Sequence, residues 1–177
     1  KVESDPDFSG DFHGSDGPIV MHRFKRETWL PDPVAFYEAC RADGYADAPD
    51  HNHPDSTGVG PTPLNNPGGI RMSTALGYLD QARHRLNLTI RADCLVRRII
   101  FDGDRASGID VESGGERFVI EAEQIILSAG AIGSPQLLML SGVGPAVHLR
   151  SLGIPVIKDA PGVGQNMRDH PAAWITW

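Results

Sequence analysis

Glycine and proline divide this sequence so often that two long segments have no room for extended helices or strands. The chain has 177 residues, of which 20 are glycine and 14 are proline, the residues that most strongly break regular structure. Together with Asp, Asn and Ser they crowd residues 1–31 and 44–70, where only residues 19–21 predict a short strand. A loop as long as 44–70 is uncommon in a compact domain and is usually functional or mobile.

Two helices are expected outside these segments. The first should cover residues 32–44, because Asp32 can cap a helix and Pro33 is tolerated at a first helical position. The second should cover residues 73–85, with Ser73 as its N-cap.

Apolar residues change from helical to alternating spacing after residue 85. A half-buried strand is expected at 86–90, followed by three apolar runs that are separated by Asp102-Gly103 and Gly114-Gly115. Both dipeptides are hairpin signals, so the three runs predict an antiparallel β-meander. Its expected strands are 94–101, 106–112 and 118–120.

Residues 124–140 predict a short apolar strand (124–127), a turn of small residues and a helix that starts at Ser134-Pro135. The buried side of this helix is expected to carry Leu137, Leu138 and Leu140. Such a unit can present backbone N–H groups to a phosphate or a cofactor ring, although many α/β folds contain one. The dinucleotide fingerprint G-x-G-x-x-G is absent from the sequence.

The C-terminal part predicts a further helix and two extended segments. The helix should reach about residue 152, a strand should cover 154–157, a turn 161–164, and the chain should be extended over 172–177. Helices and strands thus alternate with a meander between them. The expected fold class is α/β, of mixed α+β character.

Composition and charge exclude several classes of protein. The formal net charge is −7 and 40% of the residues are hydrophobic, which is too apolar for a disordered chain. No apolar run approaches the roughly 20 residues of a membrane span, so no span is expected. A dedicated nucleic-acid binder would show a basic patch or stripe, and none is visible, so no nucleic-acid partner is predicted.

Few side chains suggest chemistry on their own. Cys40 and Cys94 match no metal or redox spacing and are expected to be free thiols, with a single disulfide as the alternative. Residues 50–55 hold His51 and His53 among carboxylates, which resembles a metal site, but solvated loop histidines are the simpler interpretation, so no metal is predicted. No serine lies in a G-x-S-x-G context, which excludes an α/β-hydrolase.

One run of fifteen residues is far more specific. Residues 130–144 read G-A-I-G-S-P-Q-L-L-M-L-S-G-V-G, which resembles the second signature of the glucose–methanol–choline (GMC) flavin oxidoreductases at each specified position. Further segments that are similar to motifs of this family are residues 13–18, 50–60, 71–79 and 161–170. The resemblance spans nearly the whole chain and is of the choline-dehydrogenase-like type.

The resemblance implies an FAD enzyme that oxidises an alcohol to an aldehyde or ketone. In the family a base, usually histidine, takes the hydroxyl proton while hydride passes to flavin N5. The resemblance places the adenine beside the backbone of Val96, and the adenosine half beside the turn formed by Ser128, Ala129 and Gly130. The family's G-x-G-x-x-G motif and its catalytic His–His or His–Asn pair lie outside a segment of this kind, so no catalytic residue is expected here.

The resemblance also implies a domain layout. Because the sequence begins with Lys1 and ends at Trp177 in a strand-like run, it is expected to be the middle of a longer protein whose N- and C-terminal segments are its partners, together with a small alcohol substrate. The expected parts are an irregular linker (1–31), part of the substrate-binding domain (32–85), part of a Rossmann-like FAD-binding domain that includes the meander (86–153), and the start of the substrate-domain sheet (154–177).

Two other functions stay open at this point. One is an FAD-containing hydroxynitrile lyase of the same fold, and the other is a non-catalytic structural fragment. The identity of the alcohol, the electron acceptor and the cellular compartment are also left open. By itself, the segment is expected to be inactive.

Overall fold

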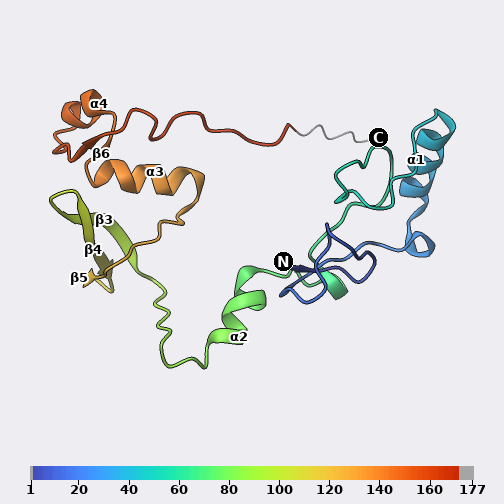
Figure 1. Cartoon of the computed structure of the whole chain (residues 1–177), viewed down its shortest axis with the longest axis horizontal. Coiled ribbons are helices and arrows are strands. Elements are labelled where there is room, and N and C mark those ends of the chain that lie inside the picture. Colours follow the sequence, from blue (N-terminus) through green and yellow to red (C-terminus); the bar gives the residue numbers. More distant parts are fainter. Residues whose placement is uncertain (1, 172–177) are drawn as a thin grey trace. The chain divides into compact units, whose positions relative to one another are not determined.

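The computed structural model describes residues 2–171 and divides the chain into two compact units (Figure 1). Unit 1 comprises residues Lys1–Thr89 and unit 2 comprises Ile90–Trp177. Each unit has its own interior, and the two are described separately. The predicted extended segment 172–177 lies outside the described residues.

Unit 1 contains little regular structure, as its glycines and prolines predict. Strands β1 (Glu3–Ser4) and β2 (Ile19–Val20) form a parallel pair, which confirms the strand expected near residue 19. A short 3₁₀ helix, η1 (Arg26–Thr28), precedes helix α1 (Pro31–Ala42).

Helix α1 begins one residue earlier than expected. Leu30 occupies the N-cap position without a side-chain hydrogen bond, so the prediction of Asp32 as the cap was wrong. Asp32 lies in the first helical turn instead, where a carboxylate still favours the positive end of the helix dipole. Gly44, with φ of +95°, follows the end of the helix in a conformation that favours glycine.

The second half of unit 1 departs further from the prediction. A 3₁₀ turn, η2 (Pro67–Gly69), precedes a π-helical turn, η3 (Ala75–Leu79), which runs into the short α2 (Asp80–Ala82). Ser73 Oγ does accept the backbone N–H of Leu76 at 3.3 Å, so the predicted cap is present. The strand predicted at 86–90 was wrong: this segment is irregular, and Leu86 is fully exposed. Alternating side chains do not make a strand where no second strand pairs with them.

The interior of unit 1 is held by charged groups rather than by an apolar core. Arg23 is 3% exposed, and its Nη1 lies 2.9 Å from both carboxylate oxygens of Asp5 while its Nη2 lies 3.0 Å from Asp50 Oδ1. His13 Nε2 lies 2.9 Å from Asp50 Oδ2, and its Nδ1 lies 3.3 Å from Asp5 Oδ2. The network therefore ties the irregular segment around residue 5 to the loop around residue 50.

Burial alone would raise the pKa of Asp5. The backbone N–H of Asp7, the Arg23 guanidinium and the N–H of Phe8 together outweigh burial, so the net result is a lowered pKa. A carboxyl whose folded pKa lies below its unfolded value stabilises the fold above about pH 4, and this contribution is lost as the pH falls through the folded pKa.

We therefore expect unit 1 to lose stability on acidification below about pH 4. The side chain of the Asp5→Asn variant does not take up a proton in this pH range, so its free energy of unfolding should decrease less steeply as the pH is lowered. Urea unfolding of the two proteins at a series of pH values measures the two slopes. Identical slopes would show that Asp5 does not contribute.

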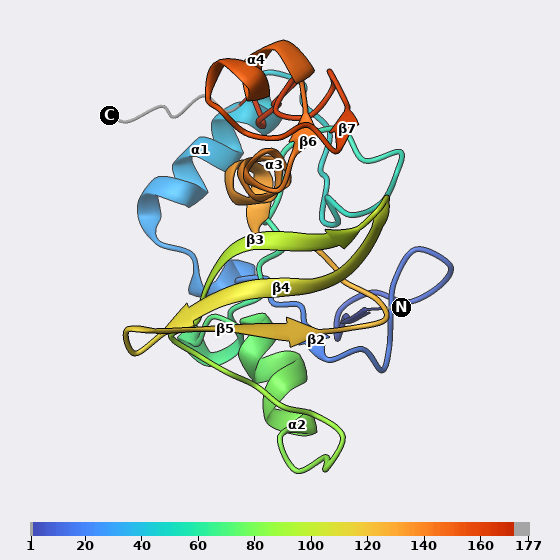
Figure 2. The same cartoon turned by 90° about the vertical axis from the view of Figure 1, so that its left-hand side faces the viewer.

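Unit 2 is built on a three-stranded antiparallel sheet (Figure 2). Its strands are β3 (Leu95–Asp102), β4 (Arg105–Ser113) and β5 (Glu116–Glu121), in the order β3-β4-β5. This confirms the predicted meander. Gly103 has φ of +62°, and Gly114 and Gly115 have φ of +60° and +84°, the left-handed conformations that tight hairpin turns require.

The rest of unit 2 comprises helix α3 (Gly130–Leu140), strand β6 (Val143–Gly144), helix α4 (Ala146–Ser151) and strand β7 (Lys158–Asp159). Strands β6 and β7 form a parallel pair. The strand predicted at 154–157 was therefore placed too early, and residues 161–164 form the predicted turn.

Two features of the predicted strand–turn–helix unit differ from expectation. Residues 124–127 form no strand, because none of the described strands pairs with them. Helix α3 begins at Gly130, so Ser134 and Pro135 lie inside it. Ser134 Oγ accepts the N–H of Ala129 at 3.0 Å, which ties the residue before the helix to its second turn, so the prediction of Ser134 as the N-cap was wrong.

The core of unit 2 joins the sheet to α3 and α4. Ile99, Val111, Leu137 and Leu149 are buried. Ser141, directly after α3, is also buried; its Oγ accepts the N–H of Ile99 at 2.7 Å and donates to the Leu137 carbonyl. A polar link thus attaches β3 to the end of α3.

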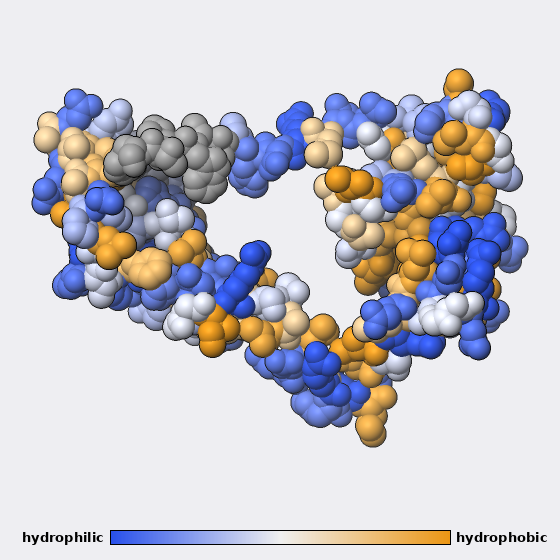
Figure 3. Space-filling view, turned by 180° about the vertical axis from the view of Figure 1, so that it is seen from behind, coloured by the Kyte–Doolittle hydropathy of each residue, from blue (hydrophilic) through white to orange (hydrophobic). Residues whose placement is uncertain are grey.

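The chain exposes more surface than its size predicts. Two separate compact units of this mass would expose roughly 10,000 Å², whereas the accessible surface is 13335 Å². Figure 3 shows hydrophobic side chains over much of the displayed face of unit 2, and Ile126, Ile132 and Val147 are each more than 70% exposed. Apolar surface of this extent is typical of a contact region. No helix formed by the described residues is long and apolar enough to cross a bilayer.

Candidate functional site

Three of the four residues expected to contact a cofactor line one hollow in unit 2. The hollow has a volume of about 810 Å³, and its walls are the start of β3, the connection before α3 and one face of α3. Val96 lies on the first wall, and Ser128 and Ala129 lie on the second. Gly130 follows directly as the first residue of α3, with φ of +84°.

The free edge of β3 determines what the first wall offers. Among the described strands β3 pairs with β4 alone, and the Ile99 N–H, which donates to Ser141 Oγ, marks its outward side. In a regular antiparallel strand, the backbone N–H and C=O of every second residue point toward the partner strand. In β3 the register shifts between Val96 and Arg98, so that this alternation is interrupted at Arg97. This irregularity turns the backbone N–H and C=O of Val96 to the outward edge, where a regular strand would have placed those of Arg97.

The walls around this edge are mostly apolar. Leu95, Leu127 and Leu137 contribute to them, and Cys94, a half-buried free thiol, lies at one end. A hollow of this size with apolar walls and a few polar groups is typical of a small-molecule site. A donor–acceptor pair on an unpaired strand edge beside apolar walls fits a heteroaromatic ring.

The α3 face of the hollow was missed from the sequence. Gly133, Gln136, Leu137 and Leu140 line it together with Ala129. Leu140 is 49% exposed, so the prediction that it is buried was wrong. The residues that share this face have the helical spacing i, i+4, i+7 and i+11: Ala129, Gly133, Gln136 and Leu140. A helix expected to start at Ser134 leaves out the first two, so the spacing was not recognised.

The other candidate residues do not form a site. Both Cys40 and Cys94 are free thiols, as predicted. His53 Nδ1 lies 4.0 Å from Asp55 Oδ2 on an exposed loop. Within residues 2–171, no three His, Cys, Asp or Glu side chains are arranged to hold a metal ion.

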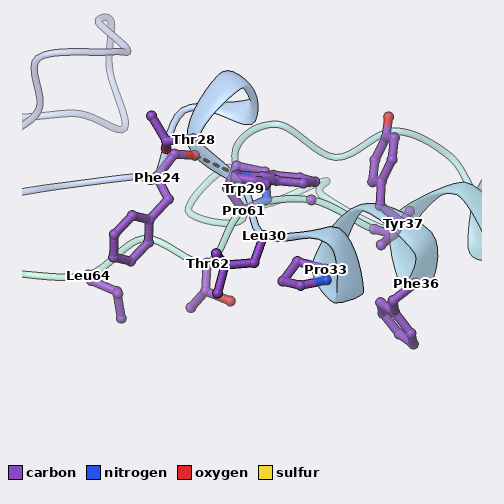
Figure 4. A pocket seen from close by; sticks show the side chains of 12 residues that line it. Phe24, Thr28, Trp29, Leu30, Pro33, Phe36, Tyr37, Pro61, Thr62 and Leu64 are labelled. Atoms are coloured by element: carbon purple, nitrogen blue, oxygen red, sulfur yellow. Dashed lines mark hydrogen bonds between the residues drawn. The ribbon is translucent and has the colours of Figure 1, made fainter.

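Unit 1 has an apolar hollow of about 450 Å³ (Figure 4). Phe24, Trp29, Leu30, Pro33 and Phe36 are among the residues that line it, and the Trp29 Nε1–H donates to the Phe24 carbonyl at 2.9 Å. Its lining includes no carboxylate, imidazole, thiol or amine. The hollow can therefore hold an apolar group, and its polar side chains are the hydroxyls of Thr28, Tyr37 and Thr62 and the indole N–H of Trp29.

Comparison with known proteins gives a consistent result. A model of the family described as GMC oxidoreductase matches residues 17–172. Over its full length, the chain is 45% identical to an uncharacterized GMC-type oxidoreductase of Rhodococcus erythropolis, of which it covers 36%. Over 94% of its length, the chain is 44% identical to an oxygen-dependent choline dehydrogenase of Burkholderia multivorans, of which it covers 30%.

Solved structures also resemble this chain. Pyridoxine 4-oxidase from Mesorbium loti matches 90% of the chain with a TM-score of 0.85 and 35% identity, and an FAD-dependent oxidoreductase from Chaetomium thermophilum matches 93% with a TM-score of 0.82 and 29% identity. The chain covers 31% of each. It thus spans about a third of the length of the proteins that it matches.

Proposed function

Because the chain belongs to the GMC oxidoreductase family, we propose that it is the central segment of an FAD-dependent alcohol dehydrogenase or oxidase. The whole protein would oxidise a primary or secondary alcohol to an aldehyde or ketone. When bound, FAD supplies the hydride acceptor, flavin N5. The residues that activate the alcohol lie in other parts of the protein, and this segment contributes to holding the cofactor.

The observation that carries this proposal is the outward edge of β3 in the unit 2 hollow. The Val96 N–H can donate to a ring nitrogen of adenine, and the Val96 carbonyl can accept from the exocyclic amine. Ser128 and Ala129 lie on the neighbouring wall, where they would border the adenosine half, and Gly130 opens α3, whose N-terminal end carries positive partial charge. The residues present therefore fit the adenosine half of FAD.

The proposed division of labour has one boundary close to that between the two units, but it also divides unit 2 after residue 153. We assign residues 86–153 to the FAD-binding domain, and residues 32–85 and 154–177 to the substrate-binding domain, with 1–31 as an irregular linker. Companion segments on both sides of the chain would cover the exposed apolar surface. The accessible surface of 13335 Å² supports such covering.

Anaerobic mixing of the full-length flavoprotein with a series of primary and secondary alcohols tests the function. We expect at least one alcohol to bleach the visible flavin absorption band, because hydride transfer reduces the flavin. Release of an aldehyde and cyanide from a cyanohydrin, with no bleaching by any alcohol, would establish a hydroxynitrile lyase instead. A full-length protein that binds no flavin would contradict both and leave a structural role.

A further inference from the structure

The wall of the unit 2 hollow carries a polar side chain to which the proposed function gives no role. Gln136 lines the hollow from α3 and is exposed. None of the hydrogen bonds within the described residues involves its carboxamide. Arg97, another polar residue of the same lining, is already paired through Nη1 with Glu112 Oε2 at 3.0 Å.

The neighbouring residues leave room for a ring beside this carboxamide. Gly133 lies three residues before Gln136 on the same face of α3. A Cβ added at Gly133 would meet only the Cβ of Ala129, at 3.2 Å, within 4 Å. Beside Gln136, the α3 face of the hollow therefore carries no side chain at Gly133, and the small side chain of Ala129 is its only near neighbour there.

A purine in this hollow presents two edges that pair a donor with an acceptor. If the Val96 backbone holds one edge through the ring nitrogen N1 and the exocyclic amine, the other edge offers N7 and the same amine. A glutamine carboxamide matches N7 and the exocyclic amine of adenine with one N–H and one carbonyl. Val96 and Gln136 stand on different walls of one hollow, as this arrangement requires.

We propose that Gln136 binds the N7 edge of the adenine of FAD and determines the preference of the site for adenine. This inference rests on the proposed function, because it takes the hollow to be the adenosine site. Gln136 is a positioning residue for the cofactor and takes no part in the oxidation of the alcohol.

Titration of the full-length apoprotein with FAD and with 7-deaza-FAD, in which a C–H replaces N7, tests the proposal. We expect the unaltered protein to bind FAD about tenfold more tightly than 7-deaza-FAD, the value of one good hydrogen bond. The Gln136→Leu variant should bind both ligands equally, with the weaker affinity. Gln165→Leu, an exposed glutamine outside the hollow, should keep the tenfold preference.

A charged variant makes the test sharper. Glutamate has the shape of glutamine but no N–H to donate, and its carboxylate repels the lone pair of N7. Gln136→Glu should therefore reverse the preference and favour 7-deaza-FAD. Equal binding of both ligands by the unaltered protein would overturn the role of Gln136 and leave the proposed function intact, whereas failure of the full-length protein to bind FAD would overturn both.

Discussion

Replacing Arg23 by methionine is expected to open unit 1. Methionine keeps an unbranched apolar stem but leaves the carboxylates of Asp5 and Asp50 buried without the guanidinium that bridges them. Breaking a buried ion pair by removing one partner costs about 3–5 kcal/mol, a large part of the 5–15 kcal/mol that typically stabilises a domain. Unit 1 has few buried apolar side chains to compensate for this loss.

Hydrogen exchange of the full-length protein, followed by mass spectrometry, measures this effect in peptides from residues 2–70. Amide exchange there should accelerate by about two to four orders of magnitude in Arg23→Met. The exchange rate of Arg23→Lys should lie between those of the unaltered protein and Arg23→Met, because an ammonium group cannot replace the planar guanidinium that reaches both carboxylates.

The matched control is Lys25→Met. Lys25 pairs with Asp7, but its side chain is 62% exposed, and an exposed ion pair is worth less than about 1 kcal/mol. Exchange should therefore change little in this variant. Equal acceleration in Arg23→Met and Lys25→Met would contradict the view that the buried network holds unit 1 together.

Replacing Val96 by proline is expected to weaken FAD binding by about 10- to 100-fold without unfolding the sheet. Proline removes the backbone N–H, and at an outward-facing position of an edge strand this breaks no ladder hydrogen bond. Val96→Ala keeps the N–H and should bind FAD within about threefold of the unaltered protein. Titration of the full-length apoproteins measures both affinities.

Leu95→Pro is the control for the fold. Leu95 lies opposite Glu112, and the shifted register turns its N–H toward β4, so proline should disturb the sheet and change the circular dichroism spectrum. Loss of FAD affinity in Val96→Ala as large as in Val96→Pro would show that the side chain, and not the backbone, makes the contact.

Local signals in the sequence predicted the parts of the fold that depend on neighbouring residues. Gly103 and the pair Gly114-Gly115 mark the hairpins because tight turns need a left-handed backbone, and the turns are observed. The cap at Ser73 could be predicted because its hydrogen-bond donor, the N–H of Leu76, is only three residues away in the sequence.

Features that depend on distant partners could not be predicted. Residues 124–127 have a strand-like composition but form no strand without a paired neighbour. Arg23 meets Asp5 and Asp50 across 18 and 27 residues, a separation that no local pattern reveals.

The candidate site shows the same division. The resemblance selected Val96, Ser128 and Ala129, which the structure places on one hollow. The shift in register that turns the Val96 backbone outward arises from pairing with β4 and has no signature in the β3 sequence. Gln136 was missed because its helix was expected to start at Ser134.

The location of the adenine ring is the most direct test of the cofactor site. An FAD analogue with a photoreactive azide on its adenine ring can be bound to the full-length protein, irradiated and traced by peptide mapping. We expect the label in peptides from residues 94–97 and 126–140, the walls of the unit 2 hollow. Excess FAD competes with the analogue and so distinguishes specific from nonspecific labelling. Specific labelling of other regions, with no label in these two segments, would contradict the assignment.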